Sequence, residues 1–166
     1  MSNFINRLKT PIPVLDRILE IVTGVMLFAL LVLTAILYHI SPDTIPTHFS
    51  ITGNPDTLMG KTFYWKVSGL FALFLLINFI SAYYPEKDTM RLPIRSKNMS
   101  IRQMMLAARL CRIINIGLAL MWLGILLSIS ALTLGIDKMV ITIVNVLAIL
   151  MIIIPSIGYG IKIIRG

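Results

Sequence analysis

The chain has 166 residues, of which 57% are hydrophobic and 13% charged, and its mean hydropathy is +0.90. That charged fraction is about half of the roughly 25% usual in soluble domains, and this excludes a water-soluble globular fold, which could not bury so much apolar surface. The formal net charge of +8 would favour a nucleic-acid partner in a soluble protein. In so apolar a chain the rules for membrane proteins apply first, and we predict no nucleic-acid partner.

Four segments lack Asp, Glu, Lys and Arg and are long enough to cross a bilayer. They are residues 21–40, 67–84, 113–136 and 139–161, with lengths of 20, 18, 24 and 23 residues. A bilayer core of about 30 Å needs about 20 apolar residues in helix, and open strands cannot satisfy their backbone groups in lipid. We therefore predict an all-α membrane protein, with residues 1–166 forming one four-helix domain. The helices are expected at about 18–40, 62–84, 101–134 and 139–161.

The orientation follows from the Lys and Arg residues outside the helices. Twelve lie before the first helix, in the link 85–112 or after the fourth helix, and three lie on the opposite side. Cytoplasmic segments carry the excess of positive charge, so both termini are predicted to be cytoplasmic. The first segment is too long for the apolar core of a cleaved signal peptide and is expected to remain as an anchor.

The third helix is predicted to begin in the cytoplasm and to continue into the bilayer. Arg102, Arg109 and Arg112 are spaced by seven and three residues, which places them near one face of this helix. We expect them to contact anionic lipid headgroups, and the alternative is that they dock an acidic cytoplasmic protein. A homo-oligomer also stays open.

Small residues mark a second face of the third helix. Gly117, Gly124 and Ser128 are spaced by seven and four residues, so another helix could approach closely there. The short link at residues 135–138 predicts that the last two helices are antiparallel neighbours.

The four segments contain no side chain that would carry charge through the membrane, as coupled transporters usually require. The chain also has no glycine-rich phosphate loop, no zinc-binding helix motif and no nucleophile elbow. We therefore predict no cofactor and no enzymatic activity.

The link 41–61 differs from the rest of the chain because it is rich in proline and polar residues. Ser41 precedes a proline that ends the first helix, and the motif GNPD at residues 53–56 predicts a turn. We expect a rigid outer loop with His48 and Asp56 as its recognition pair, and the alternative is that these two residues only hold the loop closed. The predicted ligand-binding residues are Pro46, His48, Gly53, Pro55 and Asp56.

A metal site is a further alternative for this loop. His39 and Asp43 would join His48 and Asp56 to give two imidazoles and two carboxylates, a ligand set that suits a divalent ion. The spacing matches no standard site, so we predict no metal.

The run PDTIPTHF at residues 42–49, followed by GNPD at 53–56, resembles a signature of the SdpI-type membrane protein family. A second patch, LPIR at 92–95 and RQMMLAAR at 102–109, is similar to the cytoplasmic link and helix of small stand-alone members. The resemblance implies a multi-pass protein of the bacterial cytoplasmic membrane. It also implies a relation to an immunity protein that protects the membrane from a secreted peptide toxin and holds a repressor at the membrane.

Three classes of function stay open. The first is a non-enzymatic binding, immunity or signalling protein whose outer loop recognises a peptide toxin, a lipid or another outer ligand. The second is a membrane enzyme or metal-handling protein that uses His48 and Asp56, and the third is an accessory subunit of a membrane complex. The absence of charge within the helices favours the first class.

Overall fold

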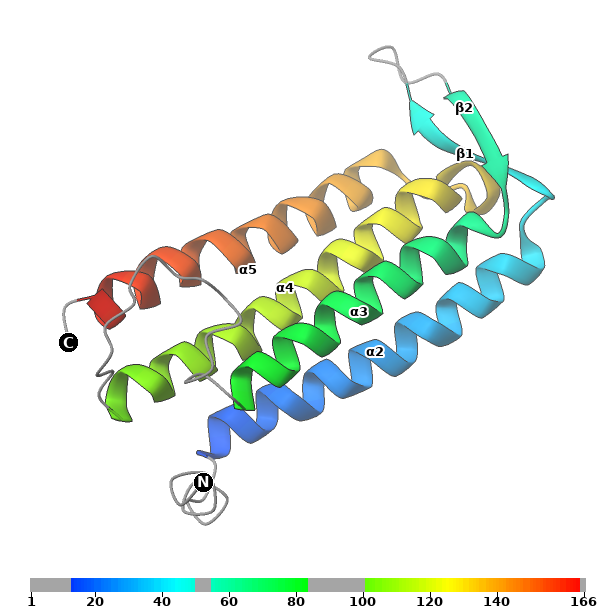
Figure 1. Ribbon diagram of the computed structural model, residues 1–166. Helices are drawn as coiled ribbons and strands as arrows, with labels where there is room; N and C mark the ends of the chain where they lie inside the picture. The colour runs from blue at the N-terminus through cyan, green and yellow to red at the C-terminus, as the bar shows by residue number, and fades with distance from the viewer. Residues whose placement is uncertain (1–12, 50–54, 84–100, 165–166) are drawn as a thin grey trace.

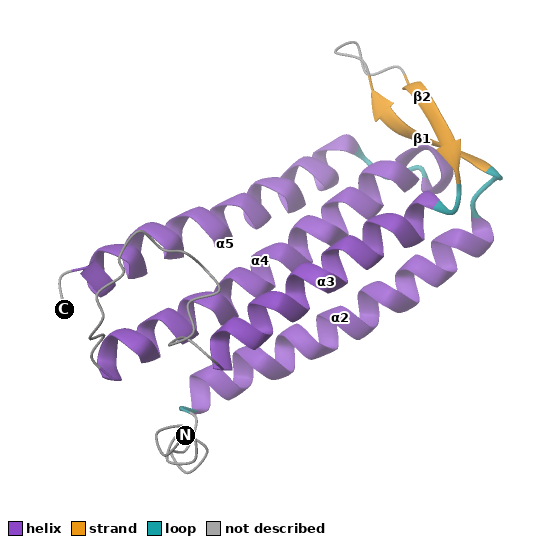
Figure 2. Cartoon of the chain, viewed as in Figure 1, coloured by secondary structure: helices purple, strands orange, loops and turns teal. Residues whose placement is uncertain are grey.

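The computed structural model describes residues 13–49, 55–83 and 101–164. Four long helices lie side by side, and a short β-hairpin stands at one end of them (Figure 1, Figure 2). In chain order the elements are α2 (Val14–Ile40), β1 (Thr44–Phe49), β2 (Pro55–Gly60), α3 (Phe63–Tyr83), α4 (Ile101–Leu134) and α5 (Lys138–Ile164). All four helices are long and apolar enough to cross a membrane, which confirms the predicted multi-pass architecture.

Helix α2 begins four residues before the predicted start, directly after Pro13. Proline is well tolerated at a helix start because the first backbone N–H groups have no partner within the helix. The early start brings Asp16 into the first turn. At the other end the backbone N–H of Ser41 donates to the carbonyl oxygen of Leu37 at 3.0 Å, and Pro42 follows the last turn.

The hydrophobic core lies between α2, α3 and α4. Helix α3 contributes Phe71 and Leu75, and α4 contributes Ala119, Trp122 and other residues at helical spacing. The rings of Phe71 and Trp122 stack with their centroids 6.3 Å apart and their planes inclined by 13°. Each helix buries one stripe and exposes the rest of its apolar surface, as expected where lipid is the solvent.

Helix α5 packs almost entirely on α4, and the short link between them makes the two helices antiparallel neighbours as predicted. The predicted small-residue face of α4 is the contact surface. A Cβ atom on Gly117 would lie 2.6 Å from Cγ1 of Ile152, and a Cβ atom on Gly124 would overlap the side-chain amide of Asn145. These two glycines therefore set the close approach of the two helices.

The hairpin corrects the expectation of an all-α chain with an irregular outer loop. Strands β1 and β2 pair antiparallel, with Thr44 opposite Gly60 and Ile45 opposite Met59, and the register shifts after Pro46. Proline is confined to edge strands and bulges, and both strands of a two-stranded sheet are edges. The two prolines at residues 46 and 55 are therefore compatible with the pairing.

The described ends of α2 and α5, Val14 and Ile164, lie at the end of the helices opposite the hairpin (Figure 1). Each helix runs from one end of the bundle to the other, so four helices bring the chain back to the end at which α2 begins. We call this the inner end and the hairpin end the outer end, following the predicted orientation. Helix α4 spans the 34 residues expected of it, and its extension into the cytoplasm stays a prediction.

Candidate functional site

The hairpin is seated on the outer end of the helices by the first residues of β1. Ile45 is completely buried and belongs to the hydrophobic core, and Pro46 is buried beside it. Strand β1 contacts α4, and the backbone N–H of Lys61 donates to the carbonyl oxygen of Asp43 at 2.9 Å, which closes the base of the hairpin. Burying a side chain as large as isoleucine contributes about 1.5–3 kcal/mol, so this contact fixes the base to the helices.

Below this seat, buried hydroxyl groups join three elements. The Tyr64 hydroxyl lies 3.1 Å from Oγ of Ser41 and 3.2 Å from Oγ of Ser130. The tyrosine on α3 therefore links the end of α2 to the outer end of α4. All three side chains are buried, where a lost hydrogen bond is costly because water cannot replace it.

A second set of buried hydroxyl groups lies further along the same helices. Oγ of Ser68 is 2.7 Å from Oγ1 of Thr34 and accepts a hydrogen bond at 3.1 Å from Nε1 of Trp122. The indole N–H and two hydroxyl groups are thereby satisfied inside the apolar core. Single Ser, Thr and Tyr residues in apolar segments give no signal in the sequence, so neither set was predicted.

The structure describes only part of the predicted set of ligand-binding residues in the hairpin. Pro46 is buried in the seat and is not part of the exposed surface. The backbone of His48 lies opposite Thr57 across the hairpin, and Pro55 lies opposite Phe49. Asp56 is the second residue of β2. Gly53 lies outside the described residues, and so do the side chains of His48, Pro55 and Asp56. The predicted pairing of His48 with Asp56 stays a prediction.

The exposed surface of the hairpin is on β2. Residues 57–60 are all exposed, in contrast with the buried residues of β1, and the hairpin projects away from the helices (Figure 1). Leu58 is 63% exposed and Met59 44% exposed. Leu58 and Met59 are successive residues of β2, so their exposed apolar side chains lie on opposite faces of the strand.

A charged and aromatic cluster lies where the hairpin meets α2 and α3. Nζ of Lys61 is 2.9 Å from Oδ1 of Asp43 and 5.4 Å from the ring centre of Tyr38. The ring of Tyr38 lies 6.4 Å from that of Trp65 and 5.8 Å from that of His39. Tyrosine and tryptophan at this position suit the boundary between lipid and water.

The ion pair in this cluster shifts the titration of both partners. The hydrogen bond and charge of Lys61 lower the pKa of Asp43 below its ordinary value, and the hydrogen bond that Lys61 donates to Asp43 raises the pKa of Lys61. The Asp43 side chain is 93% exposed and solvent screens the pair, so the pair contributes little to stability. Of the alternative metal ligands, Asp43 is occupied by Lys61, and in the described part of the chain no three His, Cys, Asp or Glu side chains gather to hold an ion.

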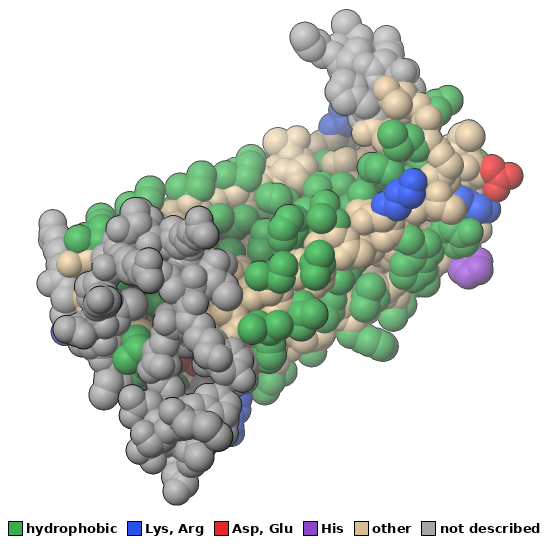
Figure 3. Space-filling view, viewed as in Figure 1, with side chains coloured by type: hydrophobic (Ala, Val, Ile, Leu, Met, Phe, Trp, Pro, Cys, Tyr) green, Lys and Arg blue, Asp and Glu red, His purple; other side chains and the backbone are tan. Residues whose placement is uncertain are grey.

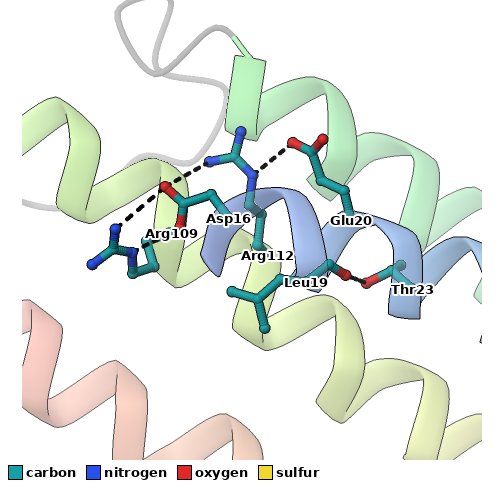
Figure 4. A network of polar contacts seen from close by, with 6 residues as sticks. All are labelled: Asp16, Leu19, Glu20, Thr23, Arg109 and Arg112. Carbon is teal, nitrogen blue, oxygen red and sulfur yellow. Dashed lines mark hydrogen bonds and ion pairs between the residues drawn. The ribbon is translucent and has the colours of Figure 1, made fainter. Parts of the chain in front are cut away.

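A cluster of four charged side chains lies at the inner end, between α2 and α4 (Figure 4). Nε of Arg109 donates to Oδ1 of Asp16 at 2.7 Å, and Nε of Arg112 donates to Oε1 of Glu20 at the same distance. Nη1 of Arg112 is also 4.0 Å from Oδ2 of Asp16, which joins the two pairs. We call these residues the inner ion-pair cluster.

Burial makes this cluster different from a surface ion pair. The side chains of Asp16 and Arg112 are 3% and 8% exposed. Two positive and two negative charges balance, which lets the chain place them at the end of an apolar bundle.

This arrangement changes the interpretation of the predicted arginine face. Arg109 and Arg112 are engaged by carboxylates of α2, and Arg102 is the member of the set that is exposed. The sequence does contain a signal for the cluster. Asp16 and Glu20 are spaced by four residues on α2, and Arg109 and Arg112 by three on α4, so each pair shares one helix face.

One face of the molecule is covered by hydrophobic side chains along the helices, with charged groups near the two ends (Figure 3). The exposed residues of α3 and α5 include large apolar side chains at most positions. This distribution is that of a protein surrounded by lipid.

Comparison with protein families gives one match. Residues 25–77 are similar to the model of a domain of unknown function, DUF1648. The matched segment contains most of α2, the whole hairpin and most of α3, and it stops before α4 and α5. No curated protein and no solved structure gave a significant match to the chain.

Proposed function

We propose that the chain is a non-enzymatic binding protein of the bacterial cytoplasmic membrane, with the outer hairpin as its recognition surface. One observation carries the proposal: β1 is fixed to the helices through buried Ile45, while residues 57–60 of β2 are exposed. A surface held in place before it meets its ligand loses less entropy on binding than a mobile loop.

The ligand class follows from the exposed side chains. Leu58 and Met59 offer apolar contact, and Lys61 and Asp43 at the hairpin base offer both signs of charge. An amphipathic peptide that acts at the membrane surface has this combination of groups. The resemblance to SdpI-type proteins supports the same class of ligand, since an immunity role requires that a peptide toxin be recognised outside the membrane.

The proposed orientation rests on the distribution of Lys and Arg along the sequence. The match to DUF1648 supports the hairpin and its two flanking helices as one unit, and it supports no particular activity. The inner end, with Arg102 exposed, would then face the cytoplasm and its anionic lipid headgroups.

A resistance assay tests the proposal. Cells that express the chain are challenged with membrane-active peptides, and the protected strain is compared with one carrying Leu58→Ser and Met59→Ser. We expect the double variant to lose protection at an unchanged protein level and melting temperature, because both side chains are exposed and neither belongs to the hydrophobic core. The control is Lys138→Gln, an exposed residue at the outer end of the bundle, where α5 begins.

His48→Ala and Asp56→Asn are tested in the same strain. Loss of protection with folded protein retained would support the predicted recognition pair. Full protection by these variants and by the Leu58 and Met59 double variant would move the function away from the hairpin. Stoichiometric zinc in the purified protein would instead favour a metal-handling role.

A further inference from the structure

Two asparagines continue the buried stripes of α3 and α4 beyond the apolar core. Asn78 follows Phe71 and Leu75 on α3, and Asn115 precedes Ala119 and Trp122 on α4, at helical spacing in both cases. Each asparagine is 2% exposed. Because the other residues of each stripe face the core between α2, α3 and α4, both amide side chains are directed into the same core.

The two asparagines also lie at the same depth. The hydrogen bond between Tyr64 and Ser130 fixes the register of α3 against α4. Asn78 is fourteen residues from Tyr64, and Asn115 is fifteen residues from Ser130. At about 1.5 Å per residue these separations are about 21 and 23 Å along the helices, so the two residues occupy one layer.

Helix α2 contributes a third polar group to this layer. Asp16, Thr23 and Leu30 share one buried stripe at spacings of seven residues. Helices α2 and α4 run in the same direction, and the ion pair between Glu20 and Arg112 fixes their register. Thr23 follows Glu20 by three residues, and Asn115 follows Arg112 by three residues, so Thr23 and Asn115 lie at the same depth. The Thr23 hydroxyl donates to the carbonyl oxygen of Leu19 at 2.8 Å and keeps its oxygen available as an acceptor.

The amide oxygens of this layer have unmet hydrogen-bonding capacity. Oδ1 of Asn78 and Oδ1 of Asn115 are both buried, and neither has a hydrogen-bond partner among the described residues. Leaving a buried polar atom unpaired costs free energy that surrounding lipid cannot recover, and such atoms in native proteins usually contact an ordered water or ion.

We propose that Asn78, Asn115 and Thr23 line an internal water site in the inner part of the bundle. Water donates the hydrogen bonds that the two amide oxygens lack, and three polar groups from three helices meet the number that a buried water needs. The nearest charges belong to the inner ion-pair cluster, whose Arg112 lies three residues from Asn115. The charges of this cluster balance, so it supplies no net negative charge that would hold a metal cation in the layer.

The site has a defined outer limit. Leu75, Phe71 and Trp122 form the next layer toward the hairpin, and this layer is apolar except for the indole N–H, which is already bonded to Ser68. Water would therefore enter from the inner end, past the inner ion-pair cluster, and would stop at the aromatic stack.

Water-edited solid-state NMR of the full chain in lipid nanodiscs tests the proposal, with water itself as the probe. Transfer of magnetisation from water is expected to reach the side-chain amides of Asn78 and Asn115 several-fold faster than the indole N–H of Trp122, which is buried and hydrogen-bonded in the dry layer. Equal, slow transfer at all three groups would overturn the proposal. A shift of the two amide signals on replacing sodium by choline would also overturn it, in favour of a bound cation.

A second measurement uses leucine, which matches asparagine in shape and has no polar atoms. If the amide oxygens lack partners in the membrane, Asn78→Leu with Asn115→Leu removes two unpaired groups and the melting temperature rises. If water satisfies them, the double variant melts no higher than the wild type, which is the result we expect. A rise of several degrees would contradict the water site.

Discussion

The inner ion-pair cluster gives the largest stability effect that the structure predicts. Asp16→Asn keeps the shape of the side chain and removes its charge. The substitution weakens the bonds from Nε and Nη2 of Arg109, at 2.7 and 3.4 Å, and leaves the 4.0 Å approach of Arg112 without its negative partner. Arg112 then depends on Glu20 for its ion pair within the described cluster.

The magnitude follows from burial. Removing one partner of a buried ion pair costs about 3–5 kcal/mol, and the lower end applies here because Arg109 is 25% exposed and can be hydrated. A loss of about 3 kcal/mol corresponds to a fall in melting temperature of about 6–12 °C for a chain of this size. Tryptophan fluorescence during heating in detergent measures it, since Trp122 is buried in the core.

Two controls make the experiment specific. Arg17→Gln changes the exposed neighbouring residue, and its effect is expected to stay within about 0.5 kcal/mol. Asp16→Leu combined with Arg109→Leu removes both charges, and its cost is expected to be smaller than the sum of the two single variants because no charge is stranded. The reasoning is refuted if Asp16→Asn melts together with Arg17→Gln.

Three further predictions concern the remaining contacts. Gly124→Val is expected to destabilise the packing of α5 on α4 by about 1–3 kcal/mol, because its side chain would overlap Asn145, and proteolysis of α5 would measure the loss. Tyr64→Phe is expected to cost about 1–3 kcal/mol in thermal unfolding, because it removes the hydroxyl that joins Ser41 to Ser130. The small stabilisation by the pair of Asp43 and Lys61 is present above the ordinary carboxyl pKa of 3.8 and is lost as the pH falls through the lowered pKa of Asp43. The stabilities of Lys61→Gln and the wild type should therefore converge at the acid end of unfolding curves measured against pH.

The helices could be predicted because lipid imposes a simple rule. Each spanning helix needs about 20 apolar residues without charge, and the four charge-free segments lie within the four observed helices, apart from a few residues at their ends. The close contact of α5 with the small-residue face at Gly117 and Gly124 could also be predicted, because side-chain volume alone decides how closely a second helix can approach.

The hairpin could not be predicted from local pattern. Prolines at 46 and 55 argue against strands, and the register shift after Pro46 breaks the alternation by which a strand is recognised. The pairing depends on the ends of α2 and α3 bringing the two strands together, and on the burial of Ile45 against α4. Both are contacts between residues distant in the sequence.

The inner ion-pair cluster was missed for a related reason. Asp16 and Glu20 lie just before the first charge-free segment and entered no predicted site, and Arg109 and Arg112 were predicted as part of a basic face. Opposite charges on two helices pair only if the helices are neighbours in the right register, and neither the neighbours nor the register can be derived from the sequence alone. The chain has few carboxylates, and two of them next to an apolar helix were nevertheless a usable signal, because charges at the end of such a helix need partners.

The central claim is that the hairpin faces outward as a recognition surface, and accessibility to an impermeant thiol reagent tests it most directly. In a Cys111→Ala background, Thr57→Cys on the exposed strand is compared with Arg102→Cys at the start of α4, both at exposed positions. We predict that the reagent labels Thr57→Cys in intact spheroplasts and labels Arg102→Cys only after lysis. The reverse pattern would place the hairpin in the cytoplasm and contradict recognition of an outer ligand.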